Sequence, residues 1–393
     1  MKLPDFLENK ENFIPFRTDT LLERMLGDPR LKKGDHQNFL HFKRLLADRF
    51  HYEYREMFES IKNDFVSLDP DRETLWEPDF SEEERQEIQI RLYQSVRNLL
   101  KICNYNEFTE EQLDVCMKSQ PIGGLSIQVD TGDFEEFQVY YRGVRKKSEL
   151  RSFLYFWSTP WEHVCLSRVF VMARLKEKYG GKVMIKMYKD VPLENIKVIA
   201  PKVKIVMPVF ARLKVGGSVL GSLFTPLTKL IFAFTLSWIY FFIILGGLLL
   251  AAFKGVMSFL SSKTKYLHVF SSSLYYLNIS NDLAAIVTLM DAAEEQDLKE
   301  AFLGYFILFV NNRALTIDEI DLEAEKWIEE QFKHQLDFEV DDAIRKLKEK
   351  DIVFTLPAST PADNDANNEV YKACDLGEVL HRLDEVWDNF NSF

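Results

Sequence analysis

The residues best suited to binding chemistry are cations that lie beside aromatic side chains. Residues 142 to 214 contain 17 Lys and Arg against 5 Asp and Glu. The candidate lipid- or partner-binding residues in this basic block are Arg142, Arg145, Lys146, Lys147, Arg151, Trp157, Trp161, Lys186 and Lys189. Such a set favours an anionic lipid surface, because each nearby cation contributes about 1 kcal/mol and tryptophan prefers the headgroup region. The alternative is that the aromatics form core and the cations pair with acidic parts of the same chain.

Carboxylates are concentrated on one predicted helical stretch, at Glu294, Glu295, Asp297 and Glu300. This segment has no Glu-x-x-His pair of the kind that carboxylate-bridged metal centres use. We therefore predict a solvated helix face, or a face that meets the basic block, and no metal. The four cysteines lie far apart without a C-x-x-C spacing, which argues against a zinc site and a disulfide framework.

Catalytic motifs do not stand out in this sequence. It has no G-x-x-x-x-G-K-[ST] phosphate loop, no strand-linked G-x-G-x-x-G and no G-x-S-x-G elbow. No cofactor is therefore predicted, and a non-enzymatic protein is favoured. An enzyme whose residues are brought together only by the fold stays open.

Charge divides the chain into three blocks. Residues 1 to 141 hold 18 Lys and Arg against 29 Asp and Glu, and residues 215 to 393 hold 14 against 27. The basic block lies between these two acidic blocks, which is the pattern that motivates both the lipid-binding and the internal-pairing interpretations.

Helix signals dominate residues 1–120, the predicted helical N-terminal region. Thr18 is predicted to cap a short helix, and apolar residues recur every three or four positions from Phe39 to Phe65. Ser81 with Glu84, and Thr109 with Gln112, fit the capping box that satisfies free amides at a helix start.

Residues 121–214 form the predicted basic β-rich module. LSIQVD and FEEFQVYYRG alternate with a period of two, as expected of a hairpin, and a second hairpin is predicted from residues 169–175 and 182–188. The predicted fold class is therefore α+β with a small antiparallel sheet.

Residues 215–260 are predicted to be embedded in a membrane. Between Lys229 and Lys254 lie 24 uncharged residues, which as a helix would span roughly 36 Å against a hydrocarbon core of about 30 Å. Small residues before this run favour a helical hairpin near 214–234 and 237–260 over a single span.

Residues 261–393 are predicted to form a helical, winged-helix-like C-terminal domain. A helix from Asp282, a helix capped by Thr316 and a helix after Asp337 precede two strands that flank a polar tip. The third helix begins with carboxylates that would repel phosphates, so nucleic acid is not predicted as a partner.

Several stretches resemble the uncharacterised family that includes transmembrane protein 143. They are YYRGVRKKSEL (140–150), KMYKDVPLENIKVIAPKVKIVMP (186–208), DAAEEQDLKEAFLGYFIL (291–308), FIPFR (13–17) and LDFEVDDAIRKLKEKDIV (336–353). The resemblance implies a membrane protein with soluble modules around its spans, usually two. It implies no reaction and no catalytic residues.

We therefore expect a membrane-anchored binding or scaffolding protein whose soluble modules face the cytoplasm. A bacterial inner membrane is the favoured location, because the first residues lack a secretory or organellar targeting pattern. The expected partners are the lipid bilayer, an anionic lipid, and a protein partner or a second copy of the chain. The alternative function is a membrane enzyme or lipid-handling protein with its site between the basic module and the membrane segment.

Overall fold

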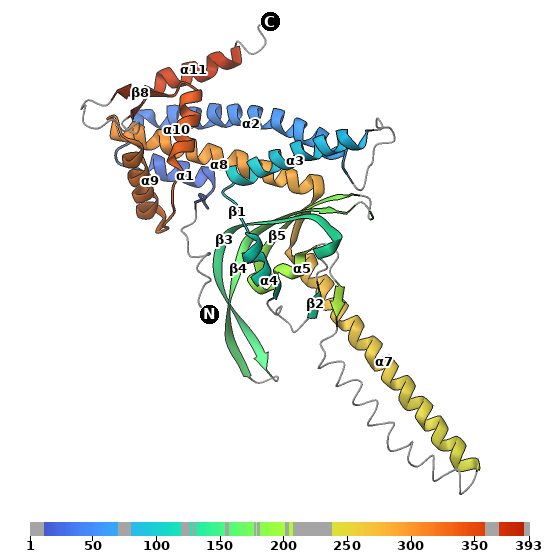
Figure 1. Cartoon of the computed structure of the whole chain (residues 1–393). Coiled ribbons are helices and arrows are strands. Elements are labelled where there is room, and N and C mark those ends of the chain that lie inside the picture. The colour runs from blue at the N-terminus through green and yellow to red at the C-terminus, as the bar shows by residue number, and fades with distance from the viewer. Residues whose placement is uncertain are drawn as a thin grey trace. The chain divides into compact units, whose positions relative to one another are not determined.

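The computed structural model combines helices with antiparallel sheets in two compact units (Figure 1). It describes residues 12–69, 80–118, 126–128, 131–153, 157–176, 178, 181–200, 204–206, 238–357 and 369–388. Unit 1 comprises Met1–Asn106, Arg142–Val144 and Ser280–Phe393, and unit 2 comprises Glu107–Tyr141 and Arg145–Ile279. Both acidic blocks therefore contribute to one unit. The four domain boundaries expected from the sequence stay a prediction.

Unit 1 is mainly helical. Its elements are α1 (Thr18–Leu26), α2 (His36–Val66), α3 (Glu82–Ile102), α8 (Asp282–Asn311), α9 (Ile317–Phe332), α10 (Val340–Glu349), β8 (Val353–Pro357), β9 (Glu369–Ala373) and α11 (Leu376–Asp388). Helices α2 and α8 pack against each other through aromatic rings, and the centroids of Phe42 and Tyr305 lie 4.4 Å apart. The apolar period from Phe39 to Phe65 thus marks the core face of α2.

Capping chemistry fixes where several helices begin. Ser81 and Glu84 form the predicted capping box of α3, and Thr316 and Glu319 form that of α9. The predicted cap at Thr18 is wrong, because Arg17 occupies the cap position and Thr18 is the first, buried residue of α1. The two helices α9 and α10 precede an antiparallel hairpin of β8 and β9, in the order expected from the sequence.

Unit 2 contains a five-stranded sheet in the order β1-β3-β4-β5-β7. Its strands are β1 (Asn106–Glu107), β3 (Phe134–Phe153), β4 (Trp157–Leu175), β5 (Val183–Pro192) and β7 (Asn278–Asn281), and a short pair is formed by β2 (Ser126–Gln128) and β6 (Lys204–Val206). Helices α4 (Glu110–Lys118), α5 (Ile196–Ile199) and α7 (Trp238–Leu277) complete the unit. Ten of the eleven residues from His163 to Ala173 are buried, and Arg168 is the exposed one.

The two predicted hairpins have different outcomes. The hairpin of residues 169–175 and 182–188 is confirmed, since β4 and β5 are antiparallel and pair Val169 with Tyr188. The hairpin joining LSIQVD to FEEFQVYYRG is wrong, because β2 pairs with β6 and β3 lies between β1 and β4. Period-two alternation predicts that a segment is a strand, but it does not name the partner strand.

The predicted membrane helix hairpin is corrected by the structure. Among the described residues, no helix combines the length and the apolar composition that a membrane crossing requires. Helix α7 begins at Trp238, within the apolar run Leu230 to Phe253. Residues 207–237, which hold the whole first predicted arm (214–234) and the start of the apolar run Leu230 to Phe253, lie outside the described residues.

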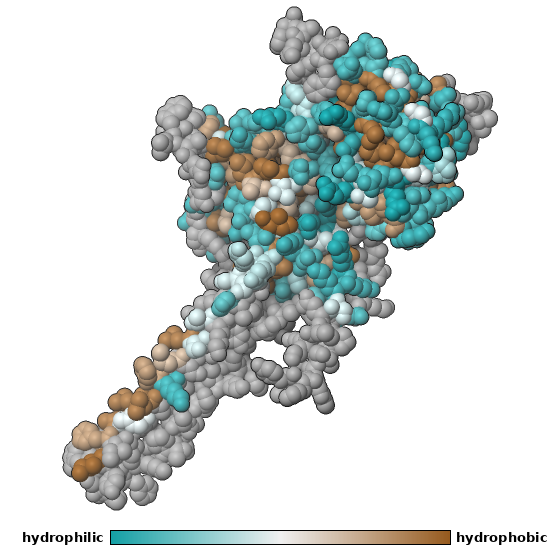
Figure 2. Space-filling view, turned by 180° about the vertical axis from the view of Figure 1, so that it is seen from behind, coloured by the Kyte–Doolittle hydropathy of each residue, from teal (hydrophilic) through white to brown (hydrophobic). Residues whose placement is uncertain are grey.

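Helix α7 nevertheless exposes large apolar side chains. Ile239, Phe242, Leu249, Leu250 and Phe253 are each more than half exposed. Figure 2 shows hydrophobic residues in brown along this helix. Soluble monomeric proteins rarely expose so many neighbouring large apolar side chains. The comparison covers only the side chains that the structure describes.

Candidate functional site

The predicted basic residues fall into two groups by their surroundings. Arg145, Lys146 and Lys189 are exposed, and Lys147 and Lys186 are partly buried. Lys147 pairs with Asp190 at 3.1 Å. Arg151, Trp157 and Trp161 lie in β3 and β4, and their side chains are outside the described residues.

Arg142 does not share the exposed surface of the other cations. Its guanidinium donates a hydrogen bond to the carbonyl of Cys103 at 2.9 Å. It also lies over the rings of Phe13 and Tyr105, at 4.7 Å and 4.9 Å from their centroids. Arg142 therefore holds together parts of unit 1, and the prediction that it contacts an external ligand has no support from these contacts.

Three exposed cations lie on neighbouring strands of the unit 2 sheet. The register of β4 and β5 places Arg168 directly opposite Lys189, so these two side chains share a face. Lys146 is exposed on β3, the neighbour of β4, and it precedes Lys147, whose ammonium pairs with Asp190 next to Lys189 in sequence. We call Lys146, Arg168 and Lys189 the cationic row.

The cationic row lacks nearby negative charge. Within the part of the chain that the structure describes, none of its three side chains forms an ion pair with a carboxylate. Like charges directly opposite each other across two strands are destabilising. Other cations of unit 2 are neutralised, since Arg174 pairs with Glu135 at 3.3 Å and Lys178 pairs with Asp133 at 2.8 Å. The row is thus a place where an anion would relieve repulsion.

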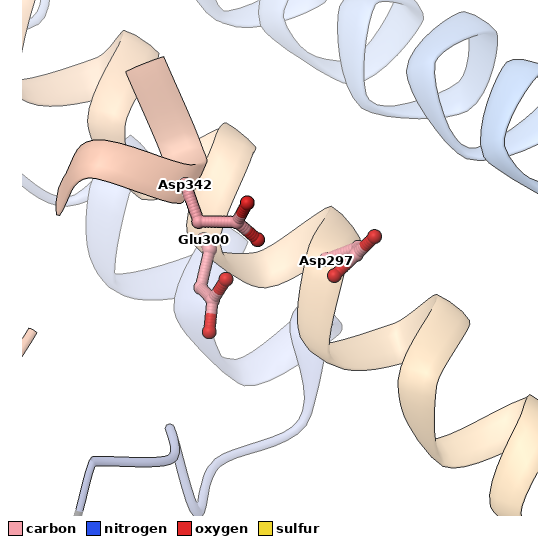
Figure 3. A group of neighbouring side chains, drawn as sticks. All are labelled: Asp297, Glu300 and Asp342. Carbon is pink, nitrogen blue, oxygen red and sulfur yellow. The ribbon is translucent and has the colours of Figure 1, made fainter. Parts of the chain in front are cut away.

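A second polar group lies in the core of unit 1. Asp297 and Glu300 come from α8 and Asp342 comes from α10, and Figure 3 shows the three as neighbours on these two helices. We call these three residues the carboxylate cluster. Their ligand-type oxygen atoms lie within 4.8 Å of one another. Asp297 is 5% exposed and Glu300 is 2% exposed, so two of the three are removed from water.

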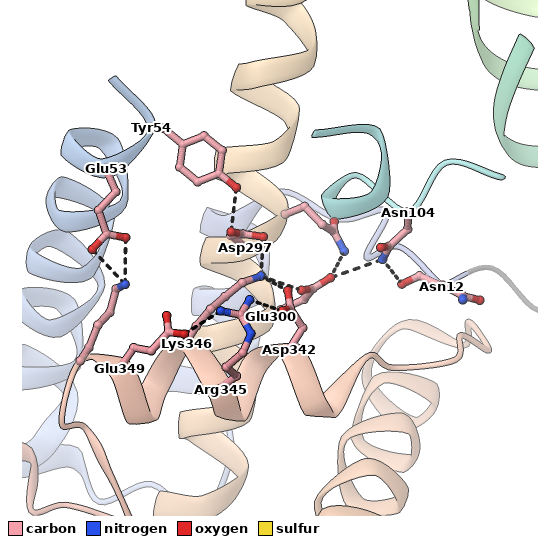
Figure 4. A network of polar contacts seen from close by, with 12 residues as sticks. Asn12, Glu53, Tyr54, Asn104, Asp297, Glu300, Asp342, Arg345, Lys346 and Glu349 are labelled. Carbon is pink, nitrogen blue, oxygen red and sulfur yellow. Dashed lines mark hydrogen bonds and ion pairs between the residues drawn. The ribbon is translucent and has the colours of Figure 1, made fainter. Parts of the chain in front are cut away.

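Lys346 of α10 supplies the cation of this cluster (Figure 4). Its ammonium nitrogen lies 2.5 Å from Asp297 Oδ1 and 3.6 Å from Glu300 Oε2, and it contacts Asp342 one turn earlier on the same helix. The ammonium therefore occupies the position between the carboxylates where a metal ion would bind. The geometry makes this an ion-pair cluster that fastens α10 to α8.

Neutral groups complete the hydrogen bonding around the cluster. Tyr54 of α2 donates to Asp297 at 2.7 Å, and Gln296 donates to Glu300 at 2.8 Å. Asn104, just beyond α3, donates to Glu300 at 3.4 Å. Three helices and the segment after α3 thus converge on two buried carboxylates.

Burial changes the protonation of these groups. It raises the pKa of Glu300 to about 8, although Lys346 acts in the opposite direction. It also raises the pKa of Asp297, while hydrogen bonds and charge from Lys346 and Arg345 hold the pKa of Asp342 below its usual value despite desolvation. Glu300 is farther from the ammonium than Asp297 is, and it is the carboxyl that retains a proton at neutral pH.

An acidic groove of about 860 Å³ lies beside the cluster in unit 1. Its charged lining consists of Asp318, Asp321, Asp337, Glu339, Asp341, Asp342, Lys101 and Arg345. Arg345 is itself paired with Asp342 and Glu349. The groove is therefore strongly negative, and the first turn of α10 forms part of its wall.

Sequence reasoning missed two features of these sites. It predicted a solvated face for the carboxylates of α8, whereas Asp297 and Glu300 are buried. It also omitted Arg168, which becomes a candidate only when the strand register places it opposite Lys189. A signal for the first was present, because Asp342 and Lys346 follow the i, i+4 spacing of an ion pair on a helix whose other face is apolar.

Comparison with known proteins assigns no activity. No solved structure matches this chain. Residues 134–283 match the model of DUF3754, which is described as a protein of unknown function. The matched stretch includes the strands that carry the cationic row and all nine candidate residues predicted from the sequence.

Proposed function

We propose that this chain is a binding protein that holds a phosphate-bearing anion on the cationic row of unit 2. One observation carries the proposal: Arg168 and Lys189 are directly opposite each other on exposed positions, and Lys146 is exposed on the neighbouring strand β3. Phosphate groups suit such a site, because guanidinium and ammonium groups donate charge-assisted hydrogen bonds to their oxygens.

The internal-pairing alternative accounts for some cations but not for the row. Lys147, Arg174 and Lys178 have carboxylate partners inside unit 2. Lys146, Arg168 and Lys189 have none among the described residues. The basic block therefore combines paired cations, which stabilise the sheet, with a smaller set available to a ligand.

The enzyme or lipid-handling alternative stays a prediction. Its site was expected between the basic module and the segment that follows it, and residues 207–237 lie outside the described residues. No specific contact favours this function over binding.

The test compares two full-length double variants that remove the same charge from the same unit. K146Q/K189Q removes two members of the cationic row, and K176Q/K182Q removes two exposed lysines just after β4 and just before β5 in the same unit. At about 1 kcal/mol per cation, K146Q/K189Q should weaken association with vesicles containing phosphatidylserine about 30-fold at low salt. K176Q/K182Q should change it less than about threefold.

Two further arms identify the source of the phosphate. Soluble inositol hexakisphosphate should compete with the vesicles if the row recognises phosphate groups alone, whereas failure to compete would assign the site to a lipid surface. Binding should weaken as ionic strength rises, because salt screens exposed charges. Equal loss of binding in both double variants would refute the proposal.

A further inference from the structure

The carboxylate cluster has one more negative charge than its surroundings balance. Asp342 is paired with Arg345 on its own helix as well as with Lys346. Asp297 and Glu300 then share the single ammonium group of Lys346. Two buried carboxylates that share one buried cation favour the uptake of one proton. Ionisation of the second carboxyl costs more free energy than it does in water, because the site is desolvated and already holds a negative charge.

The charged and titratable groups that face Glu300 come from every element packed around it. They are Asp297 and Lys299 of α8, Asp342 and Lys346 of α10, Tyr54 of α2, and Cys103 at the end of α3. Burial raises the pKa of the Cys103 thiol to about 12 and raises the pKa of Tyr54, so both stay neutral through the physiological range. Lys299 donates to the carbonyl of Ile14 at 2.8 Å, which fixes its ammonium away from the cluster's centre.

We propose that the carboxylate cluster is a proton-operated latch that holds α10 against α8. With one proton on Glu300, the remaining carboxylate and Lys346 are balanced and α10 stays docked. When the proton leaves, the cluster holds an uncompensated buried charge, and separation of α10 from α8 lets water solvate it. This inference is independent of the anion-binding proposal, because it concerns unit 1 alone.

The latch has a structural consequence for the acidic groove. Glu339, Asp341, Asp342 and Arg345 line that groove from the start and first turns of α10. Movement of α10 would therefore change the shape and the charge of the groove wall. Proton release at Glu300 is coupled in this way to a surface that solvent reaches.

Glu300 supplies the expected direction and size of the effect. Its pKa is raised to about 8 in the folded chain, against an ordinary value of 4.5 for a glutamate side chain. A carboxyl with a raised folded pKa stabilises the docked state only while it is protonated, so docking weakens as pH rises from about 4.5 to about 8. Between pH 6 and pH 9 the protection of α10 against hydrogen exchange should fall about a hundredfold after correction for intrinsic rates.

Hydrogen exchange of the full-length chain, read by mass spectrometry, tests the latch. Wild-type α10 should lose protection about tenfold per pH unit between pH 6 and pH 8 and level off above pH 8, while β4 of unit 2 serves as an internal reference without this profile. E300Q mimics the protonated side chain and should keep α10 protection constant within about twofold. D291N removes an exposed carboxylate from the same helix and should behave like wild type.

The wild-type profile keeps the proposal falsifiable even if E300Q does not fold. A wild-type chain whose α10 protection is constant from pH 6 to pH 9 overturns the latch. So does an E300Q variant that retains the hundredfold loss. The latch is supported if α10 protection in E300Q does not vary with pH while D291N shows the wild-type loss.

Discussion

We expect removal of the Lys346 ammonium to destabilise the unit 1 core strongly. Lys346→Met keeps most of the stem's volume and removes the charge. It leaves Asp297 and Glu300, at 5% and 2% exposure, without their cation. Loss of one partner from a buried ion pair typically costs about 3–5 kcal/mol, which is a large fraction of the roughly 5–15 kcal/mol that stabilises a domain.

The pH dependence of this variant's folding stability provides a second, independent test. Without Lys346, the folded-state pKa values of Asp297 and Glu300 should rise further above their unfolded values, because desolvation is no longer opposed by the ammonium. Groups whose folded pKa is raised stabilise the fold at low pH and lose that effect as pH increases. The stability deficit of Lys346→Met should therefore be larger at pH 8 than at pH 5.

Urea unfolding followed by circular dichroism measures the deficit, with Lys326→Met as the matched control. Lys326 is an exposed lysine of the neighbouring helix α9, and its replacement should change stability by less than about 0.5 kcal/mol. Addition of Asp297→Asn to Lys346→Met should restore part of the loss, since it removes one uncompensated charge. A deficit below about 1 kcal/mol, or one that does not vary with pH, would refute this view of the cluster.

Three further predictions concern contacts elsewhere in the fold. Arg142→Ala should lower stability by about 1–3 kcal/mol, because the hydrogen bond and the ring contacts of Arg142 are lost. The control Arg145→Ala removes an exposed side chain and should change stability by less than about 0.5 kcal/mol. Equal effects of the two substitutions in thermal unfolding would contradict the structural role of Arg142. Phe302→Ala should cost about 3–5 kcal/mol in urea unfolding because it opens the aromatic core between α2 and α8, and a cost below 1 kcal/mol would show that this core is not packed as described. Thr316→Ala should cost about 0.5–2 kcal/mol by removing the α9 cap, with Thr316→Ser as a control that retains the hydroxyl and most of the stability.

The helical part of the fold is largely predictable from the sequence, because local chemistry determines it. The capping boxes at Ser81 and Thr316 and the apolar period of α2 each depend on residues within a few turns of one another. The cap expected at Thr18 failed, since Thr18 is buried within the first turn of α1 and is not free to cap it.

Strand pairing and long-range burial are much less predictable. Alternation identifies β2 and β3 as strands but does not indicate that β2 pairs with β6, about 80 residues later. The burial of Asp297 depends on Lys346, which is 49 positions away in the sequence. Such contacts depend on how helices pack, and no local pattern determines that.

The membrane prediction failed for a related reason. Hydrophobic composition alone suggested a continuous span from Leu230 to Phe253, whereas helix α7 continues beyond this run through Lys254, Lys263 and Lys265. A spanning prediction requires that one helix contain the whole apolar run, and the described residues contain no such helix.

The cationic row can be tested most directly by acetylation of individual lysines in the folded, full-length chain. With inositol hexakisphosphate or phosphatidylserine vesicles present, acetylation of Lys146 and Lys189 should slow several-fold relative to the free chain, because bound phosphate covers their amines. Lys176 and Lys182, exposed on the same unit, should react at unchanged rates. Equal protection of all four lysines, or no protection of Lys146 and Lys189, would contradict anion binding at the row.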